Sequence, residues 1–370
     1  MGKQLLHTPE GVRDIYGTEY EKKLKVQTLL HKTIASYGYE DIQTPSFEFF
    51  DVFGNEIGTT PSRELYKFFD KEGNTLALRP DFTPSIARCA AKYFMDKNEP
   101  LRFSYLGNAF TNVSNLQGKL KETTQMGVEL IGDKSVYADA EVLSVTIQAL
   151  LNAGLTDFMV SVGNVEYFKG LCEEFDFSED MESTVHEYIS NKNFFGAQEY
   201  LLNENIDKSI REKLLKTGEL VGSVDVLDTA SKLADNKRSK DAIARLAELY
   251  KVLQQYGIEQ YVSFDLGMLT QYHYYTGMIF KAYTYGVGDA IVKGGRYDSL
   301  LSQFGKKAPA IGFVILIDDL MQAISRQSVE INLDDAKKVL TFTEDSFVKV
   351  LKEATALRAK GIAVEMRKEG

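Results

Sequence analysis

Cysteine, histidine and long apolar runs are scarce in this sequence. Its 370 residues include two cysteines, Cys89 and Cys172, and four histidines. Neither residue type forms a cluster with metal-ligand spacing, so we expect no metal site and no disulfide framework. No apolar run approaches the roughly 20 residues of a membrane-spanning helix, and the opening MGKQLLHTPEGVRD lacks the apolar core of a signal peptide. These absences favour a cytoplasmic protein that does not enter a membrane.

Positive charge is also in deficit. The chain has 43 lysines and arginines against 53 aspartates and glutamates, which gives a formal net charge of −10. Gripping a nucleic-acid backbone requires clustered cations, so this balance argues against that task. The hydrophobic fraction of 44% is enough for a full core, and the length suggests one large domain with an insertion or a second domain.

The first third of the chain carries two hairpin patterns. Residues 102–132, RFSYLGNAFTNVSNLQGKLKETTQMGVELIG, show two strand-like runs joined by a polar turn, and residues 65–69 and 75–78 form a second pair around DKEGN. After the second pair, Thr83 is placed to cap a helix that starts at Pro84.

The middle and the end of the chain differ from this part. From about 167 to 259 the sequence has charged, helix-forming stretches, which indicate a helical insertion; strand-like sequence then returns. Residues 331–370 predict a partial strand–helix–strand unit at the C-terminus. We therefore expect an α+β fold: residues 1–330 form a sheet flanked by helices with the insertion, and residues 331–370 form a short α/β unit.

Eight segments in order together resemble histidyl-tRNA synthetase. They are TPEGVRD (8–14), GYEDIQTPSFE (38–48), ELYKFFDKEGNTLALRPDFT (64–83), QMGVELIG (125–132), YADAE (137–141), YYTGMIF (274–280), GGRYDSLL (294–301) and PAIGF (309–313). The resemblance covers roughly the first 330 residues and implies the antiparallel sheet of a class II aminoacyl-tRNA synthetase.

The positions that hold ATP in that family have lost their chemistry here. Adenylate formation requires preorganised cations against the phosphates and an aromatic partner for adenine. By the resemblance, an arginine is replaced by Thr111, a glutamate by Val113, the stacking aromatic by Thr123 and a late arginine by Asp319. A further arginine aligns with Thr270 or Gln271.

The positions that hold the amino acid are largely kept. The resemblance implies histidine-binding roles for six residues: Asp81, Thr83, Gln125, Glu129, Tyr274 and Tyr275. The alternative is that the two tyrosines are core aromatics and that Glu129 is a solvated strand residue.

This pattern of loss is similar to the regulatory subunits of ATP phosphoribosyltransferase. That resemblance implies a non-catalytic partner of the short-form catalytic subunit in the first step of histidine biosynthesis, with feedback inhibition by histidine and no cofactor. It also implies a homodimer, built through residues 38–48, within a hetero-oligomer that binds neither tRNA nor membrane. Two alternatives stay open, a free-standing histidine sensor and an active histidyl-tRNA synthetase.

Overall fold

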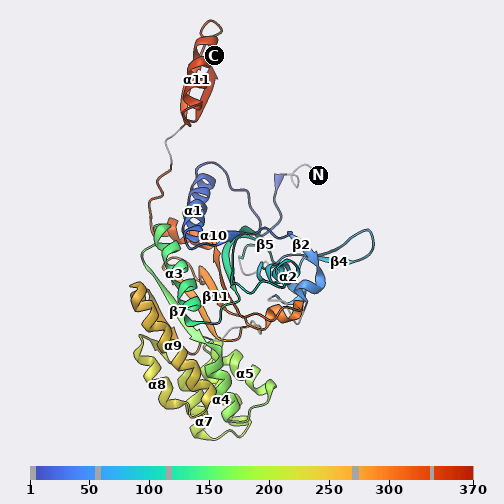
Figure 1. Cartoon of the computed structure of the whole chain (residues 1–370), viewed down its shortest axis with the longest axis vertical. Coiled ribbons are helices and arrows are strands. Elements are labelled where there is room, and N and C mark those ends of the chain that lie inside the picture. The colour runs from blue at the N-terminus through green and yellow to red at the C-terminus, as the bar shows by residue number, and fades with distance from the viewer. Residues whose placement is uncertain (1–5, 55–59, 114–118, 269–274, 334–336, 370) are drawn as a thin grey trace. The chain divides into compact units, whose positions relative to one another are not determined.

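The computed structural model describes residues 6–54, 60–113, 119–268, 275–333 and 337–369. The chain divides into two compact units, one of residues 1–14 with 27–329 and one of residues 15–26 with 330–370. Figure 1 colours the chain from its N-terminus to its C-terminus. The first helix, α1 (Gly17–Ser36), contributes residues to both units.

A mixed sheet of nine strands forms the centre of the larger unit. Its order is β1-β5-β6-β12-β11-β10-β7-β9-β8, with β1–β5 and β7–β9 parallel and the other pairs antiparallel. The strands are β1 (Glu40–Asp41), β5 (Leu101–Phe110), β6 (Glu122–Ile131), β7 (Phe158–Asn164), β8 (Val221–Gly222), β9 (Val262–Asp265), β10 (Met278–Thr284), β11 (Val292–Arg296) and β12 (Ala310–Leu316).

The hairpin predicted for residues 102–132 is confirmed as the pair β5–β6. Successive side chains of a strand point to opposite faces of the sheet, and both faces are covered in the second half of β6, where all residues from Met126 to Ile131 are buried. Val128 and Leu130 are completely buried on β6, and Tyr105 on β5 is nearly so.

Helices cover the sheet and close the core. The apolar side of α2 (Thr83–Tyr93) packs with β5 and the short helix η6 (Leu300–Phe304) in one buried cluster. Contacts to β6 and β12 come from α3 (Val136–Asn152) and α10 (Ile317–Arg326). These helices fix the strands whose ends carry the site described below.

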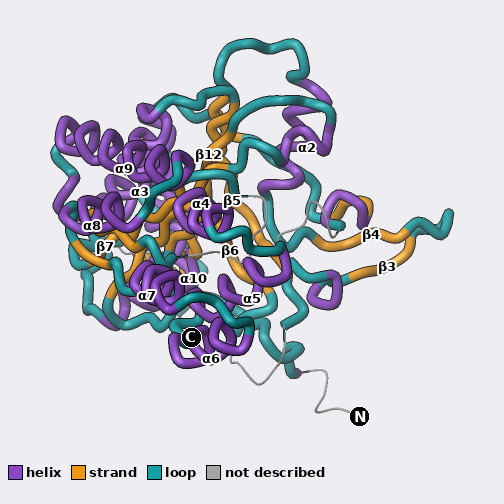
Figure 2. Tube along the Cα trace, turned by 90° about the horizontal axis from the view of Figure 1, so that it is seen from below, coloured by secondary structure: helices purple, strands orange, loops and turns teal. Residues whose placement is uncertain are grey.

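A small antiparallel sheet lies beside α2 in the same unit. It has the order β2 (Phe47–Phe49), β4 (Thr75–Leu78) and β3 (Lys67–Phe69), with η2 (Phe50–Phe53) and η3 (Ser62–Glu64) around it. The predicted hairpin is confirmed here as β3–β4, and Figure 2 shows it extending away from the main body. Its turn is held by Asp70, which accepts the backbone N–H groups of Glu72 and Asn74, while Gly73 takes a φ of 86°.

Between β7 and β9 the chain forms a group of helices, green to yellow in Figure 1. They are α4 (Val165–Glu174), α5 (Glu179–Ser190), α6 (Phe194–Asn203), α7 (Lys208–Thr217), α8 (Asp225–Leu233) and α9 (Lys237–Tyr256), followed by η5 (Glu259–Tyr261). The segment also contains β8, which pairs with β9. The limits of an insertion at about 167–259 stay a prediction.

The smaller unit contains β13 (Lys338–Phe342), α11 (Phe347–Arg358) and β14 (Val364–Lys368), with the two strands parallel. Phe342 and Phe347 contact each other with ring centroids 5.1 Å apart, and Ala354 is buried. The strand–helix–strand order matches the sequence pattern, whereas the status of residues 331–370 as a domain stays a prediction.

Candidate functional site

A cleft lies on one face of the large sheet, over β6, β12 and β11 and beside the start of α2. Five of the six predicted amino-acid-binding residues line it: Asp81, Thr83, Gln125, Glu129 and Tyr275. The sixth, Tyr274, lies outside the described residues. The structure therefore gathers residues up to 194 positions apart in the sequence around one hollow, which makes it the candidate site.

The strand register places Glu129 at the floor of this cleft. Glu129 pairs with Gly312 of β12, and Gly312 pairs with Gly295 of β11. A Cβ atom at Gly312 would lie 1.9 Å from Oε2 of Glu129, so any larger residue there would displace the carboxyl group. The glycines in this part of the sheet make room for the glutamate.

The Glu129 carboxyl group is buried and accepts two hydrogen bonds. The hydroxyl of Thr83 donates to Oε1 at 2.7 Å, and the hydroxyl of Tyr297 donates to Oε2. Burial raises the pKa of Glu129 to about 8; the two hydroxyl donors oppose this shift, and the nearby Asp81 adds to it. Glu129 is thus largely protonated at neutral pH, and a cationic ligand group would favour its ionised form.

Thr83 does not play the capping role that we predicted for it. Helix α2 begins at Thr83, its N-cap residue is Phe82, and no side chain caps it there. Instead the Thr83 hydroxyl donates to Glu129, while Asp81 Oδ1 accepts the backbone N–H of Thr83 at 3.0 Å. The prediction was wrong because the buried carboxyl group of Glu129 requires a hydrogen-bond partner and the Thr83 hydroxyl supplies it.

Sequence reasoning missed two aromatic residues of the cleft, Tyr105 and Tyr297. Tyr105 stacks on Phe82 with ring centroids 4.4 Å apart, and the guanidinium carbon of Arg79 lies 3.9 Å from the Phe82 ring centroid. Nε of Arg79 also donates to the carbonyl of Asn108 at 2.8 Å. This stack holds the segment that carries Asp81 and Thr83 against β5.

A buried ion pair fixes the end of β11 next to Tyr297. Nε of Arg296 donates to Asp139 of α3 at 3.0 Å, and Nε of Arg245 from α9 donates to the same carboxylate at 2.9 Å. Burial raises the pKa of Asp139, although both arginines oppose the shift. The strand that positions Tyr297 is thereby anchored to two helices.

Two residues at the former nucleotide positions lie in this cleft, whereas Thr270 and Gln271 lie outside the described residues. Thr111 and Thr123 line it, and neither carries a charge. Asp319 is half-buried at the start of α10, where burial and then Asp289 raise its pKa. Among the described residues that line the cleft, Lys293 is the only cation. The set of cations that a triphosphate requires is not present among these residues.

The comparisons with known proteins agree on the family. A family model described as histidyl-tRNA synthetase matches residues 11–320. The chain is 41% identical over 366 residues to the ATP phosphoribosyltransferase regulatory subunit of Acetivibrio thermocellus, covering 99% of this chain and 88% of that relative. It is 39% identical over 365 residues to the protein of the same name from Ruminiclostridium cellulolyticum, covering 99% and 87%. The chain belongs to the family of ATP phosphoribosyltransferase regulatory subunits.

Solved structures support the same family and confirm the fold class. The crystal structure of an ATP phosphoribosyltransferase regulatory subunit/histidyl-tRNA synthetase from Bacillus halodurans matches with a TM-score of 0.90 and 33% identity, over 98% of this chain and 93% of that one. Histidyl-tRNA synthetase from Nostoc sp. PCC 7120 matches with a TM-score of 0.84 at 21% identity, over 99% and 86%, which supports the fold alone. The family's name implies partnership with a catalytic subunit.

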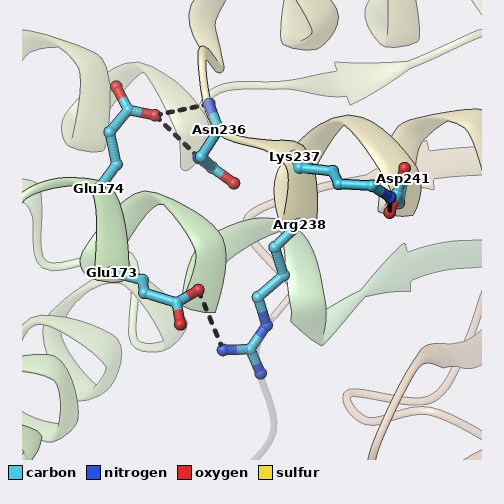
Figure 3. A pocket seen from close by; sticks show the side chains of 6 residues that line it. All are labelled: Glu173, Glu174, Asn236, Lys237, Arg238 and Asp241. Carbon is cyan, nitrogen blue, oxygen red and sulfur yellow. Dashed lines mark hydrogen bonds and ion pairs between the residues drawn. The ribbon is translucent and has the colours of Figure 1, made fainter.

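A second hollow, between α4 and α9, has a structural explanation (Figure 3). Glu174 accepts the side-chain amide of Asn236 at 2.8 Å and its backbone N–H at 3.2 Å. Arg238 lies 3.5 Å from Glu173 and 2.6 Å from Glu166. These charges satisfy each other and hold the first turn of α9 against α4, so we assign no binding role to this hollow.

Within the described ranges, no helix is both long and apolar enough to span a membrane.

Proposed function

We propose that this chain is the non-catalytic regulatory subunit of an ATP phosphoribosyltransferase, acting in the first step of histidine biosynthesis. The observation that carries the proposal is the division within one cleft. Asp81, Gln125 and Glu129 remain at the amino-acid end, whereas Thr111 and Thr123 stand where an adenylate-forming enzyme needs a cation and an aromatic ring. The 41% identity to a relative of that name supports the same reading.

The proposal extends to histidine as the ligand of the cleft and as the feedback inhibitor. Histidine carries an imidazole ring and an α-ammonium group. These match a site that offers two carboxyl groups, one amide and the aromatic ring of Tyr275. In this proposal the chain works in the cytoplasm with the short-form catalytic subunit and binds no tRNA.

A homodimer within the hetero-oligomer is part of the proposal. Phe47 and Phe49 are 51% and 57% exposed on one face of the small sheet, and Phe68 is 37% exposed next to them. An apolar face of this kind is typical of a protein interface. Light scattering after size exclusion should report a dimer that Phe49→Asp dissociates, whereas Phe195→Asp, at a site that is 72% exposed on α6, should leave it intact. A monomeric wild-type chain would contradict the dimer.

The main test mixes the full chain with the short-form catalytic subunit. We expect co-elution in size exclusion, a raised rate of phosphoribosyl-ATP formation and inhibition by histidine, because a non-catalytic chain acts on a partner only through differential contacts with its states. Gln125→Ala should retain activation but weaken inhibition. Separate elution with an unchanged rate would reject the proposal and favour a free-standing histidine sensor.

The remaining alternative, an active synthetase, has its own test. Histidine-dependent exchange of pyrophosphate into ATP should be undetectable with the purified chain, because Thr111 and Asp319 supply no positive charge for the triphosphate. A clear exchange signal would overturn the proposed function.

A further inference from the structure

The cleft has two acidic side chains and one basic side chain. Asp81 and Glu129 line its floor together with Lys293, the only lysine or arginine among the described lining residues. No sequence pattern singles out Lys293, which precedes the GGRYDSLL segment. Its presence changes the chemistry of the site, because acidic groups alone would suit any cationic ligand.

The sheet register separates the lysine from the buried carboxyl group. Glu129 pairs with Gly312, and Gly312 pairs with Gly295. Lys293 stands two residues before Gly295 on β11, so its side chain lies on the same face of the sheet. Two strand spacings and two residues put the Cα atoms of Glu129 and Lys293 about 12 Å apart. Side chains that converge from this separation can hold opposite ends of a molecule the size of an amino acid.

The present partner of Lys293 is exposed and replaceable. Its ammonium group lies 3.1 Å from Asp289, whose side chain is 58% exposed. Burial acts to raise the pKa of Asp289, but Lys293 and the backbone N–H of Ala290 outweigh it and hold that pKa below its usual range. An ion pair with an exposed carboxylate is weak, so a carboxylate bound in the cleft can take the place of Asp289.

A second lysine lies beside the first on the same face of the sheet. Lys281 of β10 pairs directly with Lys293 across the strands and is half-buried. Burial lowers its pKa first, and Lys293 lowers it further, while Asp289 and Asp265 oppose the shift. Like charges on adjacent strands repel each other. A ligand carboxylate bound next to Lys293 would relieve that repulsion.

We propose that Lys293 binds the α-carboxylate of the amino acid held in the cleft, so that the site selects a zwitterionic α-amino acid over the amine or alcohol with the same side chain. This inference rests on the proposed function, in which the ligand is histidine. The acidic end receives the cationic groups of the ligand, and Lys293 receives the carboxylate at the other end.

Calorimetry of the full chain with three ligands tests this assignment. L-Histidinol has a hydroxymethyl group in place of the carboxylate, and histamine lacks the group altogether. We expect wild-type protein to bind histidine about tenfold or more tightly than either analogue, as a hydrogen bond to a charged group typically contributes. Lys293→Met should lower the affinity for histidine by a similar factor and leave the affinity for histidinol within about twofold of the wild-type value.

Three further variants separate a direct contact from a general effect of charge. Lys293→Arg keeps a cation and should retain most of the preference for histidine. Lys281→Met removes one positive charge from the adjacent strand outside the cleft lining and should change histidine affinity less than about threefold. Asp289→Asn frees Lys293 from its partner and should strengthen histidine binding, which a purely structural lysine would not do.

The outcomes distinguish this inference from the proposed function. Equal weakening of histidine and histidinol by Lys293→Met, or equal affinity of the wild type for both, would overturn the carboxylate assignment. Inorganic phosphate that binds the wild type as tightly as histidine and loses affinity in Lys293→Met would reassign the site to free anions. Absence of histidine binding would also overturn the assignment of Lys293. Activation of the catalytic subunit is measured separately and decides the proposed function.

Discussion

Glu129→Gln is expected to alter the way in which stability depends on pH. Burial raises the pKa of Glu129 to about 8, whereas its ordinary value is 4.5. Between these values the unfolded chain has released the proton and the folded chain retains it, so the free energy of unfolding falls as pH rises. At about 1.4 kcal/mol per unit, this group costs about 1 kcal/mol at pH 5 and about 5 kcal/mol at pH 9. Glutamine has no such proton, so the variant should gain about 4 kcal/mol on the wild type across this range.

The measurement is urea unfolding of both proteins by circular dichroism from pH 5 to 9. Other groups titrate in both proteins, so the difference between the two curves isolates Glu129. The amide also changes the hydrogen bonds with Thr83 and Tyr297, which offsets the curves by a nearly constant amount. The free energy of unfolding of the variant, relative to that of the wild type, should therefore rise steadily with pH up to about 8 and then level off. Parallel curves across the range would refute the raised pKa and the buried, largely protonated carboxyl group.

Three other changes have definite expected results. Gly312→Ala places a methyl group 1.9 Å from Glu129 Oε2 and should abolish the rise in melting temperature that the proposed histidine binding predicts for the wild type; an unchanged rise would contradict the packing. Arg296→Met leaves the buried Asp139 with Arg245 as its remaining cation and should cost about 1–3 kcal/mol in urea unfolding, so an unchanged stability would count against this pair. Thr83→Val removes a donor that lowers the pKa of Glu129. In this background the stability difference between the Glu129→Gln variant and its parent should level off above pH 8, and an unchanged pH of levelling-off would argue against that hydrogen bond.

The sequence predicted the elements that local patterns determine. Both hairpins were placed correctly because strand alternation and the turn residues around Gly73 are local signals. Five residues of the cleft could be named in advance because the motifs that carry them resemble those of a known family.

What the sequence left out depends on the pairing of distant strands. Tyr297 and Lys293 enter the cleft only because β11 pairs with β12 and β12 with β6. No local pattern specifies that order, and GGRYDSLL served only as one segment of the family resemblance. Thr83 was assigned to a helix cap because its buried acceptor, Glu129, is 46 residues away.

The buried glutamate also bears on whether the cleft is a relic or a working site. A scaffold under selection for stability alone gains nothing from a carboxyl group whose ionisation is opposed by burial, because an apolar side chain of similar size avoids the cost. Glycine at 312 and the hydroxyl donors from Thr83 and Tyr297 are arranged around this one group. Proteins tolerate such costs chiefly where function requires the group. The cost at Glu129 therefore favours a cleft that still binds a ligand, even though the adjoining nucleotide positions have lost their charges.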